Sequence, residues 1–484
     1  MAVEKNEIFS NLIWRFAERF GAQIITFVVN LVLARILLPE DYGMVAMINV
    51  VIVILQVFVD SGLGNALIQK PGADDLDFST VFFFNMGMCT LIYALLCMAA
   101  PWIAEFYKNP AMTPVIRVVG LTLVVSGVKN VQQAYVSRNL LFKTFFFATL
   151  GGTLFSAVVG IFLACQGAGV WALAAQHLTN LCMDTVILWI MVKWRPKLLF
   201  SWQRFRALFS FGWKLLASSL LETVYNNLQN LIIGKKYTSA DLAYYQRGDQ
   251  FPSLLVTNIN TSIGSVLFPA MAREQDDRES LRAHVRRAIS VSSYLLWPLM
   301  VGLAVCAEPL VRLLLTDKWL PAVPYMQIAC FVYGLMPIHT TNLQAITAMG
   351  RSDWYLRLEI IKKTVGLTVL LIAMHFGVLA IAASAIFTGC LGTFLNSWPN
   401  RKLLGYSFQE QLRDIAPSLF LSAFMGLIVW QVNRLSLSPL PTLLIQVPLG
   451  AAVYLLGSRI FHLESYEYVL SAVKPLLGRL RRIR

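Results

Sequence analysis

Two stretches of the chain carry polar and charged side chains at intervals of three or four residues within otherwise apolar runs. The first stripe consists of Arg15, Arg19, Gln23, Thr26 and Asn30, and the second of Ser219, Glu222, Asn226, Gln229 and Asn230. This spacing predicts that each set shares one face of an α-helix. Guanidinium groups bind phosphate and acidic sugars in bidentate fashion, and amides exchange hydrogen bonds with sugar hydroxyls. The stripes therefore predict the walls of a hydrated site for a phosphorylated or acidic glycan.

A third helical face adds Lys129, Gln132 and Gln133, again three and four residues apart. Lys129 brings a further cation to the predicted site, and Gln133 a further amide. The alternative interpretation is structural, because polar side chains inside a membrane protein also form hydrogen bonds between neighbouring helices.

Three carboxylates are candidates for ion coupling. Glu222 lies near the middle of its apolar run, Asp184 lies deep in another, and Asp60 lies towards the inner end of a third. A protonatable carboxylate at membrane depth is the usual element of proton or sodium coupling. Glu18 is predicted instead to pair with Arg15, one turn away.

The composition identifies the class of protein that holds these side chains. Of 484 residues, 57% are hydrophobic and 14% are charged, whereas soluble domains carry about 25% charged residues. A disordered chain would also be more polar. Because a membrane span needs roughly 20 apolar residues, the sequence predicts an all-α polytopic membrane protein.

Apolar runs separated by short polar loops predict fourteen spans. Their approximate limits are 11–35, 43–64, 78–100, 114–137, 144–165, 168–192, 208–234, 243–268, 288–315, 322–349, 353–376, 378–398, 413–433 and 440–461. With the N-terminus inside, 28 of the 40 Lys and Arg residues fall on inner segments and 8 on outer ones. The positive-inside rule therefore predicts that both termini are cytoplasmic.

The two halves of the chain are related by an internal repeat. Asn30, Asp41 and Gly64 match Asn230, Asp241 and Gly264 at an offset of 200. Further along the chain, the segments that begin at Gly169 and Gly377 match at an offset of 208. The repeat predicts two six-helix bundles, 1–192 and 213–400, related by a pseudo-two-fold axis along the membrane normal. Such transporters bind substrate between the halves and alternate access by rocking them.

The predicted bundles are joined by a basic linker, 193–212, and followed by two extra helices and a basic cytoplasmic tail within 401–484. Aromatic and arginine side chains alternate in the linker, which predicts a helix in the membrane interface. The net charge of +14 is attributed to cytoplasmic loops and lipid contact, because no nucleic-acid-binding motif is present.

No catalytic constellation occurs in the sequence. It lacks a P-loop, a GxSxG elbow and an HExxH pair, and its cysteines show no metal-ligand spacing. The sequence therefore predicts a transporter without cofactor or metal, and not an enzyme.

Two motifs resemble those of a known family. The segments Leu37-Leu38-Pro39-Glu40-Asp41-Tyr42-Gly43-Met44 and Asp60-Ser61-Gly62-Leu63-Gly64-Asn65-Ala66-Leu67 look like those of the polysaccharide transporters. These Wzx-type flippases belong to the multidrug/oligosaccharidyl-lipid/polysaccharide (MOP) exporter superfamily, whose layout of six, six and two helices agrees along nearly the whole chain. Within the family, the chain looks most like the colanic-acid exporters of enteric bacteria.

The resemblance implies a function. It implies a flippase that moves undecaprenyl-pyrophosphate-linked oligosaccharides across the bacterial inner membrane for exopolysaccharide synthesis, with the polysaccharide polymerase as a partner. The family's cationic lumen is carried over to Arg15, Arg19 and Lys129. The alternatives are a cation-coupled multidrug antiporter, which would favour an acidic chamber, and a peptidoglycan-precursor flippase, which would share these electrostatics.

Overall fold

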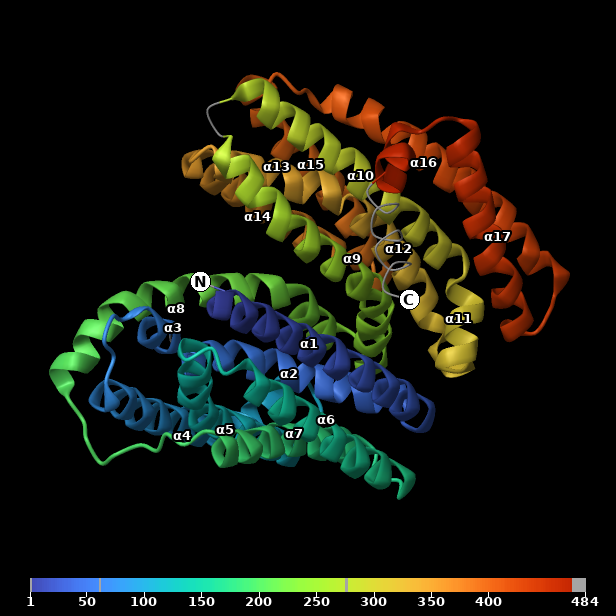
Figure 1. The fold of residues 1–484 in the computed structure, drawn as a ribbon. Coiled ribbons are helices and arrows are strands. Elements are labelled where there is room, and N and C mark those ends of the chain that lie inside the picture. Colours follow the sequence, from blue (N-terminus) through green and yellow to red (C-terminus); the bar gives the residue numbers. More distant parts are fainter. Residues whose placement is uncertain (1, 61, 275–276, 472–484) are drawn as a thin grey trace. The chain divides into compact units, whose positions relative to one another are not determined.

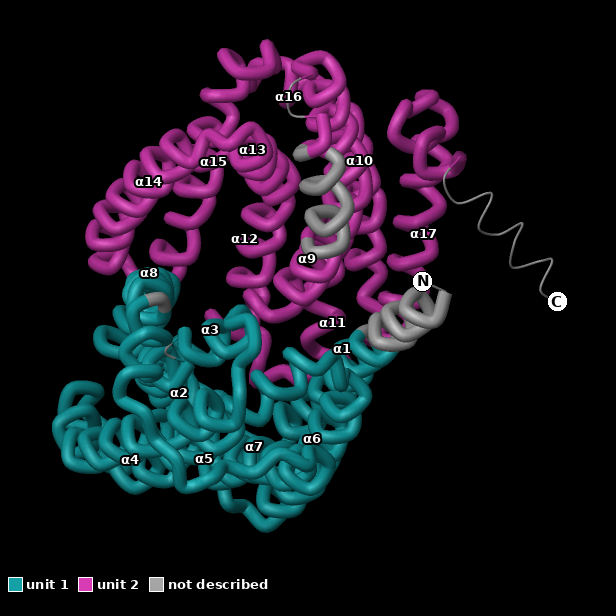
Figure 2. The backbone as a smooth tube through the Cα atoms, turned by 60° about the vertical axis from the view of Figure 1, so that its left-hand side comes forward, with its two compact units in different colours: residues 1–243 teal, residues 244–484 magenta. Residues whose placement is uncertain are grey.

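The protein is helical along its described length. The structure, a computed structural model, describes residues 2–60, 62–274 and 277–471, and these ranges contain no strand. The helices divide into two units, Met1–Ala243 and Tyr244–Arg484 (Figure 1, Figure 2). The predicted all-α class is confirmed, and the basic tail beyond residue 471 lies outside the described residues.

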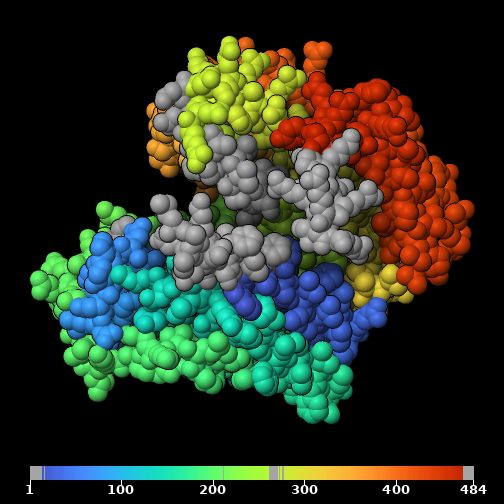
Figure 3. Space-filling model, viewed as in Figure 1, coloured from blue at the N-terminus to red at the C-terminus, as the bar shows by residue number. Residues whose placement is uncertain are grey.

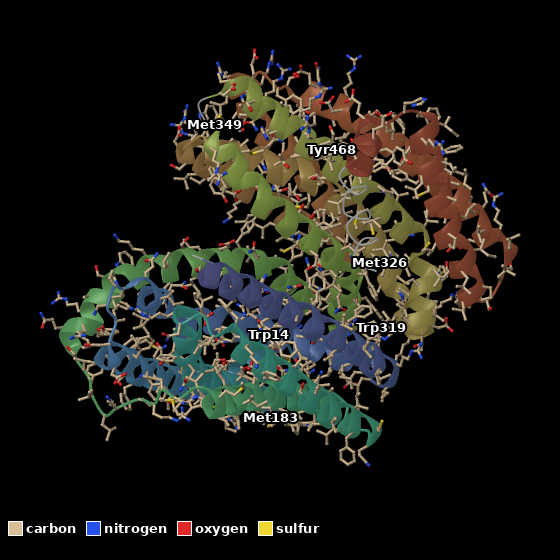
Figure 4. All side chains as sticks on the ribbon, in the orientation of Figure 1. Trp14, Met183, Trp319, Met326, Met349 and Tyr468 are labelled. Carbon is tan, nitrogen blue, oxygen red and sulfur yellow. The ribbon has the colours of Figure 1, made fainter. Side chains whose placement is uncertain are left out.

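The first unit contains α1 to α8. Their bounds are α1 (Ala2–Ile36), α2 (Pro39–Asp60), α3 (Leu63–Gln69), α4 (Asp75–Phe106), α5 (Met112–Arg138), α6 (Phe142–Cys165), α7 (Val170–Met191) and α8 (Trp202–Lys236). Val29 and Leu33 of α1 are buried against Ala157 of α6 and Leu173 of α7. At the other end of α1, Trp14 meets Phe146 edge-on at 5.1 Å (Figure 4). α1 thus packs along α6, whereas α8 packs on α2, α3 and α4.

The second unit contains the helices that follow. They are α9 (Ser239–Arg273, which begins in unit 1), α10 (Arg278–Val305), α11 (Ala307–Leu314), η1 (Asp317–Ala322), α12 (Val323–Gly334), α13 (Met336–Ala348), α14 (Ser352–Ala373), α15 (Val378–Leu403), α16 (Phe408–Gln431), η2 (Val432–Leu435) and α17 (Pro439–Ile460). α10 lies at the centre and packs against α12, α13 and α16. Phe420 and Leu444 leave 72% and 66% of their surfaces exposed on the last helices, shown in orange and red in Figure 3. Such an apolar surface fits contact with lipid.

Each of the fourteen predicted spans falls on a helix or on a broken pair of helices. Within the described residues, ten segments are long and apolar enough to cross a membrane. The remaining predicted spans coincide with α7, α8, α9 and α14. The exact number of spans and the division into six-helix bundles stay predictions.

The repeat is visible in how corresponding helices begin. The Asp41 carboxylate accepts the backbone N–H of Leu38 at the start of α2, and the Asp241 carboxylate accepts that of Thr238 at the start of α9, both at 3.1 Å. A carboxylate in the first turn also stabilises the positive end of the helix dipole. Asp41 and Asp241, which match at an offset of 200, therefore play the same capping role.

A second matched pair marks the starts of α7 and α15. Gly169 and Gly377 are the N-cap residues, and both have positive φ, at 56° and 106°. Glycine is favoured there because a Cβ atom disfavours this region of backbone space. The repeat match at an offset of 208 thus reflects the same turn geometry.

Three predicted spans are interrupted, and the one predicted at 288–315 is divided at Cys306, between α10 and α11. α2 stops at Asp60 and α3 starts at Leu63, separated at Gly62, whose φ is 68°. The span predicted at 322–349 is divided at Leu335, because Pro337 lies in the first turn of α13, where its missing N–H costs no helical hydrogen bond.

The basic linker is bound to the start of α4. The backbone N–H groups of Lys197 and Ser201 donate to the hydroxyls of Ser79 and Thr80, at 3.0 and 3.1 Å. The Trp194 indole N–H donates to Asp75 at 3.1 Å. These bonds hold the linker on the helical bundle, whereas Leu198, which is 92% exposed, points away from it.

A cluster of aspartates completes this attachment. The Asp77 carboxylate is fully buried and binds Lys70 at 2.6 Å and Arg204 at 3.1 Å. Arg204 also binds Asp74, the N-cap of α4, at 2.7 Å. The backbone N–H of Asp77, together with the Arg204 guanidinium, holds the pKa of the Asp74 carboxyl below its usual range. Asp74 therefore stays charged at neutral pH and attracts the Arg204 guanidinium.

Asp77→Ala is expected to lower the free energy of unfolding by about 1–3 kcal/mol, because two cations lose a charged acceptor and α4 loses part of its capping box. Lys70 and Arg204 are about one-third exposed, which keeps the loss moderate. Thermal melting of the detergent-purified protein measures it. Asp75→Ala is the matched control, since its carboxylate is 47% exposed. An equal loss in both variants would contradict a special role for Asp77.

Candidate functional site

The α1 stripe divides into a paired cation and a set of unpaired polar side chains. Arg15 donates to the Glu18 carboxylate at 2.6 Å, and its guanidinium lies over the rings of Phe142 and Phe145 at 5.5 and 4.9 Å. Thr149 of α6 also donates to Glu18, at 3.3 Å. The predicted pairing of Glu18 with Arg15 is confirmed, and it directs Arg15 towards α6.

Three further side chains of this stripe differ from Arg15. Arg19 is exposed, and Gln23 and Asn30 are half-buried. Within the described ranges, none of the three side chains makes a hydrogen bond or ion pair. Of the two arginines of the stripe, Arg19 is therefore the one without a carboxylate partner among the described residues.

The second stripe, on α8, has the same character. Glu222 and Asn226 are exposed, and Asn230 is half-buried with its Oδ1 atom enclosed but not hydrogen-bonded. In the part of the chain that the structure describes, these three side chains also lack hydrogen-bond and ion-pair partners.

The two stripes belong to one unit. α1 and α8 lie along the same side of unit 1 (Figure 1, Figure 2). If the stripes were hydrogen-bonding contacts between helices, their amides would have partners on neighbouring helices. Six of these side chains have none among the described residues, which leaves them available to water or to a polar ligand.

Lys129 and Asp184 form an ion pair inside unit 1, between α5 and α7. Only 14% of the Lys129 side chain and 10% of the Asp184 side chain are exposed. Gln133, one turn further along α5, is half-buried and has no hydrogen-bond partner among the described residues. The structure thus joins a predicted lumen cation to a predicted coupling carboxylate, so each neutralises the other.

A polar strip between α6 and α7 accompanies this pair. The Asn180 amide donates to Ser156 at 3.2 Å and approaches Thr153 at 3.5 Å. Gly152 lets the helices come close, because a Cβ atom there would lie 2.8 Å from the Asn180 carbonyl oxygen. The ion pair therefore lies in a polar part of the bundle, where its desolvation is partly offset.

Asp60, the third carboxylate candidate, ends α2. It accepts from Gln56 at 3.5 Å and from Asn130 at 3.4 Å, and it is exposed. Asn130 adjoins Lys129, so consecutive residues of α5 contact Asp60 and Asp184.

Sequence reasoning missed Asn130 and Asn180. A signal existed for Asn180, which precedes Asp184 by four residues and so shares its helical face. Nothing in the sequence singled out Asn130, because its partner lies 70 residues away. No group of three or more potential metal-ligating side chains occurs among the residues described.

Comparisons with known proteins agree with the fold and with the membrane location. The family model described as "Polysaccharide biosynthesis protein" matches residues 32–324. Lipopolysaccharide biosynthesis protein WzxC of Escherichia coli (strain K12) is 25% identical over 82% of this chain and 83% of that protein. Succinoglycan biosynthesis transport protein ExoT of Rhizobium meliloti (strain 1021) is 24% identical over 72% of this chain and 71% of that protein.

Solved structures are similar to the whole fold. An inward closed structure of the lipid II flippase MurJ has a TM-score of 0.76 and 14% identity, and covers 93% of this chain and 99% of that one. An inward-facing multidrug resistance MATE transporter of the MOP superfamily has a TM-score of 0.63 and 15% identity. It covers 81% of this chain and 98% of that one. The predicted MOP-type fold is confirmed by these likenesses. Because the family model covers more than half of its residues, the chain belongs to the polysaccharide biosynthesis protein family, as its resemblance to the polysaccharide transporters predicted.

Proposed function

We propose that this protein is a flippase for undecaprenyl-pyrophosphate-linked oligosaccharides in the bacterial inner membrane, with both termini cytoplasmic. The observation that carries the proposal is a set of six polar side chains on α1 and α8 of unit 1 that lack partners among the described residues: Arg19, Gln23, Asn30, Glu222, Asn226 and Asn230. A glycan cargo supplies the hydroxyl groups that such amides bind. Alternating access is the expected mechanism for a fold of this type.

Arg19 is the residue assigned to the pyrophosphate. Arg15 and Lys129 already have carboxylate partners, whereas Arg19 has none among the described residues. Gln23, Asn30, Gln133, Asn226 and Asn230 are proposed to contact the sugars. A colanic-acid repeat unit is the proposed cargo, as the resemblance to the colanic-acid exporters implies. The likeness to a lipopolysaccharide biosynthesis protein and to a succinoglycan transport protein supports a polysaccharide precursor as cargo.

Glu222 is the proposed site of proton or sodium coupling. Its carboxylate is exposed on the α8 stripe and has no partner in the described ranges. Asp184 is held by Lys129, and Asp60 accepts two amide hydrogen bonds, so both are less available to a transported ion.

The polysaccharide polymerase that receives the flipped unit is a proposed partner.

Arg19→Ala is expected to slow flipping about tenfold or more, because one charged hydrogen-bonded contact contributes about 1.5–3 kcal/mol. The assay is the transfer of labelled polyprenyl-pyrophosphate oligosaccharide between leaflets of proteoliposomes, with and without a proton or sodium gradient. Arg312→Ala is the matched control, since that arginine pairs with Glu308 and Asp317. A rate equal to that of the unmodified protein would remove Arg19 from the substrate site.

The alternative cargoes are tested in the same vesicles. The likeness to the MurJ structure favours a peptidoglycan-precursor flippase as the second candidate, and the MATE likeness favours a cation-coupled drug antiporter. Transfer of lipid II but not of oligosaccharide lipids, or efflux of a cationic dye alone, would replace the proposed function by the respective alternative.

A further inference from the structure

A cavity of about 530 Å³ lies in unit 2. It is lined by the start of α10, the start of α16 and the segment directly after α17. Its volume falls within the range of small-molecule sites, about 300–1,000 Å³.

Two ion pairs form the fixed wall of this cavity. Arg286 binds Asp414 in bidentate fashion at 2.9 and 2.8 Å, and the Tyr406 hydroxyl donates to the same carboxylate at 2.6 Å. Arg282 binds Glu410 at 2.9 Å. These four charges cancel, so they do not by themselves attract an anion or a cation.

Arg413 and Glu464 are the remaining strongly charged side chains of the lining. Both are exposed, and neither makes a hydrogen bond or salt bridge within the described residues, although the charge of Glu464 also acts on Arg286. The lining thus offers one available cation and one available anion. A lone anion would meet the Glu464 charge and a lone cation the Arg413 charge, whereas a zwitterion complements both.

The position of the cavity fits a lipid head group. The positive-inside rule places the arginine-rich start of α10 and the start of α16 at the cytoplasmic surface. Ile460 and Phe461, at the end of α17, leave 69% and 68% of their surfaces exposed and offer an apolar contact for acyl chains.

The segment after α17 is held in place on α10. The Arg287 guanidinium lies 5.0 Å from the centroid of the Tyr468 ring, and Figure 4 shows Tyr468 beside this helix. Glu464 is therefore carried on an anchored segment, opposite the start of α16 that carries Arg413.

We propose that this cavity binds the head group of a zwitterionic aminophospholipid, with its phosphate on Arg413 and its ammonium on Glu464. Phosphatidylethanolamine has the matching chemistry, because its ammonium donates hydrogen bonds to a carboxylate. Phosphatidylcholine lacks those donors, and phosphatidylglycerol lacks the cation. The site is separate from the proposed transport function.

The test measures lipid binding to the full-length purified protein by native mass spectrometry, with phosphatidylethanolamine, phosphatidylcholine and phosphatidylglycerol as probes. Phosphatidylethanolamine is expected to bind most tightly, and Arg413→Ala and Glu464→Gln are each expected to weaken it about tenfold. Arg434→Ala is the matched control, since that arginine lies over Trp430 and outside the cavity.

Three results would each overturn the proposal. The first is unchanged phosphatidylethanolamine binding in both variants, and the second is binding of phosphatidylglycerol as tight as that of phosphatidylethanolamine. The third is displacement of the lipid by glycerophosphoethanolamine at an equal concentration, which would make a soluble phosphoamine, and not the membrane, the source of the ligand.

Discussion

Lys129→Ala is expected to lower the free energy of unfolding by about 3–5 kcal/mol, because it leaves the buried Asp184 carboxylate without its counter-charge. The neighbouring Asn180 amide is already bonded to Ser156 and cannot replace an ammonium group. The expected readout is a marked loss of monodisperse protein on size-exclusion chromatography and a lower melting temperature in detergent. A variant as stable as the unmodified protein would contradict the buried pair.

The double variant Lys129→Met with Asp184→Leu separates stability from transport. Apolar side chains of similar volume often replace a buried ion pair with little loss of stability, so melting is expected to return close to that of the unmodified protein. Normal flipping by this variant would show that the pair has a structural role. Stable protein with lost flipping would show that transport itself needs the charges.

Asn342→Leu is expected to destabilise unit 2 by about 3 kcal/mol, because it removes three buried side-chain hydrogen bonds that each contribute about 0.5–1.5 kcal/mol net. The Asn342 amide donates to Gln411 at 2.8 Å, and its side-chain oxygen accepts from Asn400 at 2.6 Å and from Gln411 at 3.1 Å. All three side chains are fully buried. The partners would keep only their other bonds, from Ser397 to Gln411 at 3.0 Å, from Gln411 to the Tyr406 carbonyl at 3.4 Å and from Asn400 to the backbone carbonyl of residue 342 at 3.3 Å.

Thermal melting of purified protein measures the Asn342→Leu effect. Thr347→Val on the same helix is the matched control, because the Thr347 hydroxyl is exposed and bonds only the Leu343 carbonyl of its own helix. Similar melting temperatures for the two variants would mean that the Asn342 network does not stabilise the fold.

The fold class followed from one-dimensional patterns. Apolar runs of spanning length predicted the helices, and breaks at Gly62 and before Pro337 reflect residues with known backbone preferences. The repeat was equally readable, because Asp41 and Asp241 cap their helices through contacts three residues away in the chain. Features that depend on local geometry were therefore determined by the sequence itself.

The candidate site was predicted in part. Helical periodicity placed Arg19, Gln23 and Asn30 on one face, and the structure finds no protein partner for them within its described ranges. Periodicity also grouped Arg15 with them, but the contact with Glu18 and the rings of α6 turns that guanidinium towards its own bundle. A helical face is thus a local property, whereas the direction of a long side chain depends on its neighbours.

Only the tertiary structure decided which polar groups meet. Lys129 and Asp184 are 55 residues apart, and Asn342 and Gln411 are 69 apart, so no spacing rule relates them. Buried polar groups must be paired, but the identity of each partner depends on which helices pack together and in which rotation. The sequence by itself determined a duplicated, all-helical membrane protein with two polar stripes, and helix packing determined which of its charges are neutralised and which remain available.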